Sequence, residues 1–239
     1  MARRTKAKAG ESTRDRIIAT ASAHLATGGP RGVELRAVCE ELDISPSLVN
    51  YYFASPGEVI WEAAVLGYSR YVEEQEAAMR SCADGEAALR GWVEHALAWT
   101  RANPGIAAVV DFPMVALNEH GADAERFASA LSPHSRKNVA LLGSAVFALM
   151  TGKELRILSS TRVAAMIRIN AEYAYWVSTI GFSTLGAAMW VAGRKPYGLI
   201  WRAFGFDPDS QVSSSIDEAV RRITAKRIKL ELPPDPDDE

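Results

Sequence analysis

Apolar residues recur every three to four positions along most of this 239-residue chain, which is the spacing of one helix face. No stretch alternates apolar and polar residues between hairpin turns, as strands do. The pattern therefore predicts an all-α fold. We expect the helices to cover residues 12–28, 34–42, 46–52, 56–82, 85–102, 104–119, 122–131, 133–157, 161–193 and 210–228.

Four of these helices are expected to begin where a capping residue precedes a proline. The pairs are Ser45-Pro46, Ser55-Pro56, Asn103-Pro104 and Ser132-Pro133. A side-chain oxygen there accepts a free backbone N–H, and proline in the first helical position has no N–H to leave unbonded. Glu58 extends the second pair to a capping box, in which its carboxylate accepts the N–H of Ser55.

The segment 33–53 has the layout of a helix-turn-helix, since it contains two short predicted helices joined by a tight turn at Asp43-Ile44. The second helix, 46–52, is too short to be a core element, and small and amide side chains fall on its outer side. Such a helix suits insertion into a DNA major groove. We expect Leu48, Val49, Tyr52 and Phe53 to point inward and Ser47, Asn50 and Tyr51 to point outward.

Charge is unevenly distributed, although the net charge is only −2. Residues 1–11 form a basic arm with Arg3, Arg4, Lys6 and Lys8, and we expect it to be flexible. Residues 231–239 are acidic and broken by prolines, which predicts a solvated, flexible tail. The two cysteines lack metal-ligand spacing, and no apolar signal sequence follows the basic arm, so we expect a reduced, cytoplasmic protein.

The segment 174–193 carries no charged residue and is long enough to span a bilayer. Its hydroxyl and small side chains lower its apolarity, and Glu172 and Arg168 precede it on the same predicted helix. A helix that is apolar on all sides also suits a protein interior or a subunit interface. We therefore favour a buried or dimer-interface helix over a membrane span.

Sequence motifs of enzymes are missing from the chain. There is no GxSxG elbow, P-loop, HExxH or paired Cys/His site. The four histidines, at 24, 95, 120 and 134, show neither triad-like nor ligand-like spacing. We expect a protein that is not an enzyme and that needs no metal and no cofactor.

Residues 12–60 together resemble the DNA-binding domain of the TetR family of transcriptional repressors. The similarity lies in a first helix ending at Gly28-Gly29, the helix-turn-helix, and the Tyr52-Phe53 pair before a new helix. Four positions depart from the family pattern. Asp43 stands where a turn glycine is usual, and its side chain tolerates left-handed backbone. Glu34 and Pro56 replace a hydroxyl residue and a lysine that commonly contact phosphates, and Asn50 replaces a frequent tyrosine.

The resemblance implies a repressor with a DNA-binding domain at 12–55 and an α-helical ligand-binding and dimerisation domain at 56–230. Its double-stranded DNA operator would be near-palindromic, because a homodimer reads two half-sites. The helices 133–157 and 161–193 are candidates for the dimer face. A small-molecule-binding or membrane-associated helical protein with a vestigial helix-turn-helix is the alternative. The DNA-binding residues expected are Arg36, Ser45, Pro46, Ser47, Asn50, Tyr51 and Tyr52.

Asn50 is the first candidate for a base contact, since a carboxamide can bond N6 and N7 of adenine together. Each of the other candidates has an alternative role without DNA contact: Ser45 as a helix cap, Arg36 as a solvated charge, and Tyr51 in packing on the domain surface. The basic arm either adds DNA affinity or serves as a solubilising tail.

A small-molecule effector would bind where aromatic and Met side chains from several helices line an apolar cavity with a few polar anchors. The same stripes are also typical of a plain core, and a lone histidine is often only a packed side chain. The ligand-binding residues expected are Trp92, His95, Trp99, Phe112, Phe147, Met150, Tyr173 and Trp176.

Overall fold

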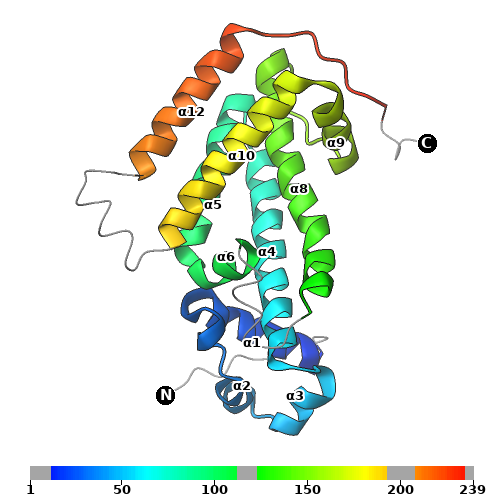
Figure 1. Cartoon of the computed structure of the whole chain (residues 1–239), viewed down its shortest axis with the longest axis vertical. Helices are drawn as coiled ribbons and strands as arrows, with labels where there is room; N and C mark the ends of the chain where they lie inside the picture. The colour runs from blue at the N-terminus through cyan, green and yellow to red at the C-terminus, as the bar shows by residue number, and fades with distance from the viewer. Residues whose placement is uncertain (1–11, 112–122, 193–207, 235–239) are drawn as a thin grey trace. The chain divides into compact units, whose positions relative to one another are not determined.

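The computed structural model describes residues 12–111, 123–192 and 208–234 (Figure 1). Throughout these ranges the regular structure is helical, which confirms the all-α prediction. The helices are α1 (Thr13–Gly28), η1 (Pro30–Gly32), α2 (Leu35–Leu42), α3 (Pro46–Tyr52), α4 (Pro56–Arg80), α5 (Gly85–Ala102), α6 (Pro104–Asp111), α8 (Ala124–Thr151), α9 (Ser160–Ile169), α10 (Ala171–Ala192) and α12 (Pro208–Ala225).

The chain divides into two compact units. The first comprises residues 1–67 and 105–128, and the second comprises residues 68–104 and 129–239. Helices α4 and α8 each contribute their first part to the first unit and their remainder to the second. The division at residue 56 into DNA-binding and ligand-binding domains concerns function rather than packing, and it stays a prediction.

The first unit is organised around α1, which packs against α2 and α3. The hydroxyl of Ser12 begins α1 by accepting the N–H of Asp15 at 3.1 Å. The inner face of α1 buries Ile17 and Leu25 completely, and α2 contributes Val38 to the same core. Burying these side chains stabilises the small helices, since helices of this length are marginal on their own.

In the second unit, α10 packs against α5, α9 and α12 (Figure 1). The last part of α8 is enclosed, and every residue from 140 to 150 is buried. Because that segment is covered on all sides within this unit, it offers no surface to a second subunit. The prediction of the 133–157 helix as a dimer face is therefore wrong for residues 140–150.

Several predicted helix boundaries differ in the structure. Pro133 lies inside α8 instead of beginning a new helix: α8 continues on both sides of it, although proline supplies no N–H and its ring crowds the preceding turn. The predicted helix 161–193 is interrupted at Asn170, which is extended at φ −129° and ψ 104°. The side-chain oxygen of Asn170 accepts the N–H of Tyr173 at 2.8 Å and so caps the start of α10.

The predicted cap at Ser55 is present, since its hydroxyl accepts the N–H of Glu58 at 3.2 Å. The carboxylate of Glu58 accepts the N–H of Ala54 at 2.6 Å. Helix α8 ends at Thr151 and is followed by Gly152, whose φ of +66° is the left-handed conformation common after a helix. The predicted end at residue 157 is therefore about one and a half turns too late.

After α12 the chain runs back across the second unit in extended form. The N–H of Ile228 donates to the carbonyl of Met150 at 3.0 Å, and Lys153 donates to the carbonyl of Leu230 at 3.3 Å. Arg162 donates to the carbonyl of Pro233 at 3.2 Å, so part of the predicted tail 231–239 lies against the unit. Residues 235–239 lie outside the described residues.

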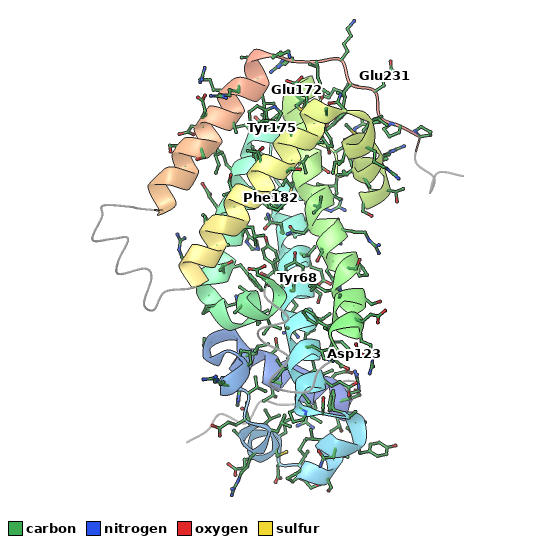
Figure 2. The ribbon with its side chains drawn as sticks, viewed as in Figure 1. Tyr68, Asp123, Glu172, Tyr175, Phe182 and Glu231 are labelled. Carbon is green, nitrogen blue, oxygen red and sulfur yellow. The ribbon has the colours of Figure 1, made fainter. Side chains whose placement is uncertain are left out.

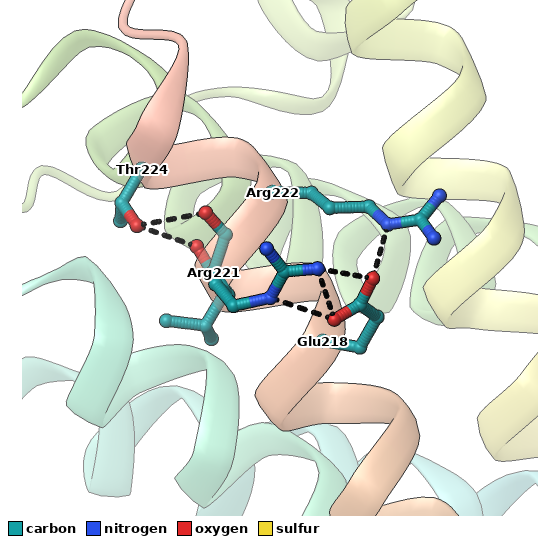
Figure 3. A network of polar contacts seen from close by, with 5 residues as sticks. Glu218, Arg221, Arg222 and Thr224 are labelled. Atoms are coloured by element: carbon teal, nitrogen blue, oxygen red, sulfur yellow. Dashed lines mark hydrogen bonds and ion pairs between the residues drawn. The ribbon is translucent and has the colours of Figure 1, made fainter.

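The outer face of α12 carries a cluster of ion pairs within one helix (Figure 3). The carboxylate of Glu218 accepts hydrogen bonds from Arg221, at 2.6–2.8 Å, and from Arg222. These bonds hold the pKa of Glu218 below its usual range. Exposed ion pairs of this kind contribute little to stability, and we assign these no role beyond that of solvated surface residues.

Candidate functional site

The turn between α2 and α3 is formed by Asp43 in left-handed backbone, at φ 57° and ψ 49°. Its N–H donates back toward the carbonyls of Cys39 and Glu40, which closes the end of α2. The N–H of Ile44 also donates to Cys39, at 3.0 Å. The expectation that Asp43 serves in place of a turn glycine is confirmed.

Helix α3 has one buried and one exposed side. Val49 is buried on it, and Phe53, the residue that follows it, is buried as well. Asn50 is exposed, and Tyr51 is 80% exposed. This arrangement leaves a row of polar and aromatic groups free to contact another molecule. The exposed residues among the predicted DNA contacts of α3 are Pro46, Ser47, Asn50 and Tyr51.

The prediction that the Ser45 side chain caps α3 is wrong. Its hydroxyl forms a hydrogen bond of 2.8 Å with the hydroxyl of Ser47 and no bond to a backbone N–H of the helix. The reason is local: the N–H of Leu48, which a cap would bind, donates to the backbone carbonyl of Ser45 at 3.0 Å. Both hydroxyls therefore lie exposed at the first turn of α3.

The two remaining candidates lie at the margins of this surface. Arg36 on α2 is 90% exposed, and its Nε donates to Glu40 at 3.2 Å. Tyr52 is half-buried, with its ring edge-on to Tyr51 at 5.1 Å between centroids. The ion pair of Arg36 is exposed and weak, so its guanidinium can contact another molecule. Tyr52 serves partly to pack α3. We define Arg36 and residues 45–52 as the α3 surface.

The inner side of α3 is supported by α1 and α4. Arg14 of α1 lies over the ring of Phe53, 5.2 Å from its centroid, and forms an ion pair with Glu62 of α4. Burial raises the pKa of Glu62 despite the nearby arginine. Arg126 of α8 pairs with Glu58 at 3.5 Å and lies over the ring of Trp61. These contacts tie three helices of the first unit to the base of the α3 surface.

The charge of this part of the chain is unfavourable for binding a polyanion. Residues 12–67 contain four arginines and no lysine against seven carboxylates. The basic arm, residues 1–11, supplies four further cations but lies outside the described residues. If the α3 surface meets DNA, the arm must therefore supply much of the electrostatic attraction.

The second group of candidates lies in the core of the second unit. Trp92 on α5 is buried, and its indole N–H donates to the side chain of Asn138 on α8 at 3.0 Å. Asn138 in turn donates to the hydroxyl of Tyr68 on α4 at 3.2 Å. Figure 2 labels Tyr68 on α4. A chain of hydrogen bonds thus joins three helices of the second unit.

Beside this chain, aromatic rings from α4 and α5 form a cluster. The rings of Tyr71 and His95 are stacked, with 5.4 Å between centroids and planes 7° apart. Trp99 lies 4.6 Å from Tyr71 and 6.2 Å, edge-on, from Tyr68. We call Tyr68, Tyr71, His95 and Trp99 the aromatic cluster. It brings together two of the predicted ligand residues, His95 and Trp99.

The remaining predicted ligand residues are spread through the same core. Tyr173 is fully buried on α10, and Phe147, Met150 and Trp176 are buried on α8 and α10. Lys153 lies over the ring of Phe147 at 5.6 Å from its centroid. Phe112 lies outside the described residues. Packing against one another is sufficient to explain the burial of these apolar side chains, and their role as ligand contacts stays a prediction.

Three buried side-chain atoms in the described part of the chain have no hydrogen-bond partner: Gln75 Oε1, His95 Nε2 and the hydroxyl of Tyr173. Such atoms are uncommon, because each loses its hydrogen bonds to water on burial. Two of them, on Gln75 and His95, belong to the facing helices α4 and α5. This feature makes the α4–α5 contact the best ligand site candidate.

Gln75, Tyr68, Tyr71 and Asn138 were missed by the sequence reasoning. Gln75 carried a signal, since it falls in the apolar register of α4 with Tyr71, Val72 and Met79, where a polar side chain has to be buried. Asn138 carried none, because the residues that it joins lie on two other helices.

The described residues hold no group of three or more His, Cys, Asp or Glu placed to bind a metal ion. Within the same residues, every helix is too short or too polar to cross a membrane, α10 included.

The fold, unlike the sequence, is similar to that of a known protein. No protein-family model and no curated protein matches the chain. Among solved structures, the chain is similar to the transcriptional regulator SCO7222, a TetR from Streptomyces coelicolor, with a TM-score of 0.53. The alignment covers 91% of this chain and 100% of that chain, at 18% sequence identity. The chain therefore has a TetR-like fold, as the residues of its helix-turn-helix led us to expect.

Proposed function

We propose that this protein is a DNA-binding transcriptional regulator. In its fuller form, a repressor binds a near-palindromic operator as a homodimer and is released by a small, largely apolar effector. The α3 surface carries the proposal, since a seven-residue helix with exposed polar groups follows a tight turn in a TetR-like fold. Asn50 would read a base edge, and Ser45, Ser47 and Tyr51 would contact phosphates or base edges. Arg36 would contact the DNA backbone.

A homodimer is part of the proposal because one such helix contacts too few bases for a specific operator. The surface that suits it is a stripe on α10 formed by Tyr175, Ser178, Phe182, Leu185 and Gly186, all exposed and none charged. Figure 2 labels Tyr175 and Phe182 along this helix. Tyr175 is 55% and Phe182 74% exposed, which is unusual for aromatic side chains in a stripe. A second copy would cover them.

Regulation would follow from two states of the dimer, of which one places both α3 helices in successive major grooves. An effector shifts the balance between these states only by binding one of them more tightly. Release on binding is the arrangement expected for a repressor.

The first experiment measures binding of the purified protein to the DNA that flanks its own gene, with excess random competitor, at two salt concentrations. Selective binding that survives the competitor supports the regulator. Binding that the competitor removes, or that disappears at moderate salt, would mean that only the basic arm is engaged. The alternative of a ligand-binding helical protein with a vestigial helix-turn-helix would then replace the regulator proposal. The deficit of positive charge in residues 12–67 would explain the missing DNA affinity.

A further inference from the structure

We propose that the second unit binds, at the contact of α4 and α5, an uncharged aromatic molecule whose hydroxyl or amide hydrogen-bonds to Gln75 and His95. The inference deepens the proposed function, from which it takes only that an effector binds in this unit. It rests on what the two unpartnered atoms require and on the rings around them.

The first requirement is a hydrogen-bond donor for Gln75. Its side chain is 1% exposed, and its amide nitrogen donates to the backbone carbonyl of Trp92 at 2.9 Å. Only the NH₂ end of an amide can donate to a carbonyl, so the orientation of the amide is determined and Oε1 is the atom left without a partner. An acceptor that is buried and held in one orientation calls for an O–H or N–H of a ligand.

The second requirement concerns His95, one helical turn beyond Trp92 on α5. Its ring is held by stacking on Tyr71, which lies one turn before Gln75 on α4. The free Nε2 of His95 and the free Oε1 of Gln75 therefore belong to neighbouring turns of the same helix pair. A hydroxyl suits both atoms when His95 carries its proton on Nε2, because the hydroxyl donates its one proton to Oε1 of Gln75 and accepts from Nε2–H; a primary amide, with two N–H donors and a carbonyl, suits either tautomer.

The surroundings favour an aromatic body for the ligand. Tyr71 and Trp99 present ring faces and edges 4.6 Å apart between centroids, with Tyr68 next to both. Planar rings pack well on such groups in offset or edge-on arrangements. Buried apolar surface supplies most of the affinity of a small ligand, and a few polar groups supply its selectivity.

A charged ligand fits less well. The neighbouring carboxylate on α4, Glu76, already pairs with Lys137 at 2.5 Å and with Arg80 at 2.6 Å. These bonds hold the pKa of Glu76 below its usual range. A charged ligand buried here would lose its hydration and gain no ion pair to compensate, so we assign the site to neutral molecules.

The test uses the full-length protein without DNA and phenol as the probe, with toluene and benzoate for comparison. Binding is followed by calorimetry and by the ¹⁵N resonances of His95. We expect phenol to bind about 10- to 100-fold more tightly than toluene, and benzoate to bind more weakly than phenol. The His95 Nε2 resonance should shift with phenol.

The Gln75→Leu variant should lower the phenol-to-toluene ratio several-fold, because the phenol hydroxyl then keeps only its bond to His95. Thr100→Val is the matched control, since Thr100 is a buried polar residue of α5 whose hydroxyl already donates to Ala96 at 2.9 Å, and it should leave the ratio unchanged. Thermal unfolding of each variant establishes that it is folded.

Equal binding of phenol and toluene would overturn the inference, as would an unchanged ratio in Gln75→Leu or an unmoved His95 signal. In those cases Oε1 of Gln75 and Nε2 of His95 would form hydrogen bonds only to fixed water molecules. These readouts require no DNA. If the protein binds phenol selectively but does not bind DNA, only the proposed regulatory function is wrong. If it binds DNA but does not prefer phenol, only this ligand site is wrong.

Discussion

The hydroxyl of Tyr173 on α10 lies directly against Gly143 on α8. A Cβ at Gly143 would stand 2.4 Å from that oxygen and 2.6 Å from a methyl group of Val163. The hydroxyl has no hydrogen-bond partner, and burial raises the pKa of Tyr173 well above its usual range. The contact between α8 and α10 thus requires a residue without a side chain at 143, and the opposing hydroxyl is buried there at a cost.

Two substitutions at this contact should change stability in opposite directions. Tyr173→Phe keeps the ring and removes the unpartnered hydroxyl, so the free energy of unfolding should rise by about 1 kcal/mol. Gly143→Ala should lower it by about 1–3 kcal/mol, because the core must shift to admit a methyl group. Urea denaturation measures both. Gly91→Ala on α5 is the control: the nearest atom to its Cβ position is Sγ of Cys82, at 4.0 Å, so it should stabilise slightly.

Asn50→Ala should alter which DNA sequences bind, without affecting the fold. The side chain is exposed, so its loss removes no packing. Discrimination at one position of each half-site should fall by about 1–3 kcal/mol, measured by competition between operators with single base changes. Arg36→Ala should instead weaken all sequences alike. If Asn50→Ala instead lowered the affinity for all sequences equally, Asn50 would not contact a base.

Replacing Arg3, Arg4, Lys6 and Lys8 by serine should reduce the salt dependence of DNA binding. Since residues 12–67 carry more carboxylates than arginines, these four cations would be the main source of attraction to phosphates in the proposed complex. The slope of log K against log salt should become shallower by up to about 3.6 for each arm, which is about 0.9 for each of its four cations. Arg221→Ser with Arg222→Ser, on the paired cluster of α12 (Figure 3), is the control and should leave the slope unchanged. An unchanged slope in the arm variant would make the arm a solubilising tail.

Phe182→Glu should convert the proposed dimer to a monomer, because it places a charge in the middle of the α10 stripe. Sedimentation or light scattering of the purified protein measures the change. Ile169→Glu is the matched control, since Ile169 on α9 is 71% exposed and Phe182 is 74% exposed. A dimer that survives Phe182→Glu and not Ile169→Glu would place the interface on α9.

The stability of the first unit should decline between about pH 4 and pH 6 through Asp111. Burial raises the pKa of this last residue of α6 from 3.8 to about 6. The folded chain therefore binds the proton more tightly than the unfolded chain, and this contribution is present below pH 4 and lost as the pH passes 6. Asp111→Asn should be more stable at pH 7.5 by up to about 3 kcal/mol, with the difference disappearing below pH 4. An equal difference at both pH values would exclude titration as its cause.

Local signals were sufficient for much of the first unit. The left-handed turn at Asp43, the start of α3 at Pro46 and the outward position of Asn50 depend on residues a few positions apart, and the structure has all three. Ser45 was different, because its hydroxyl had two partners within reach and bonded to Ser47 instead of capping. Alternatives of nearly equal energy are where local reasoning fails.

What the sequence by itself determined was the all-α class and the helix-turn-helix, since helix periodicity, caps and turn residues act over a few positions. Only the tertiary structure showed that α8 runs through Pro133, a position where the Ser-Pro pair is equally compatible with the start of a helix. It alone placed Gln75 beside Trp92, Asn138 between two helices, and Tyr173 against Gly143. Those relationships join residues 17 to 70 positions apart in the chain, and no spacing rule connects them.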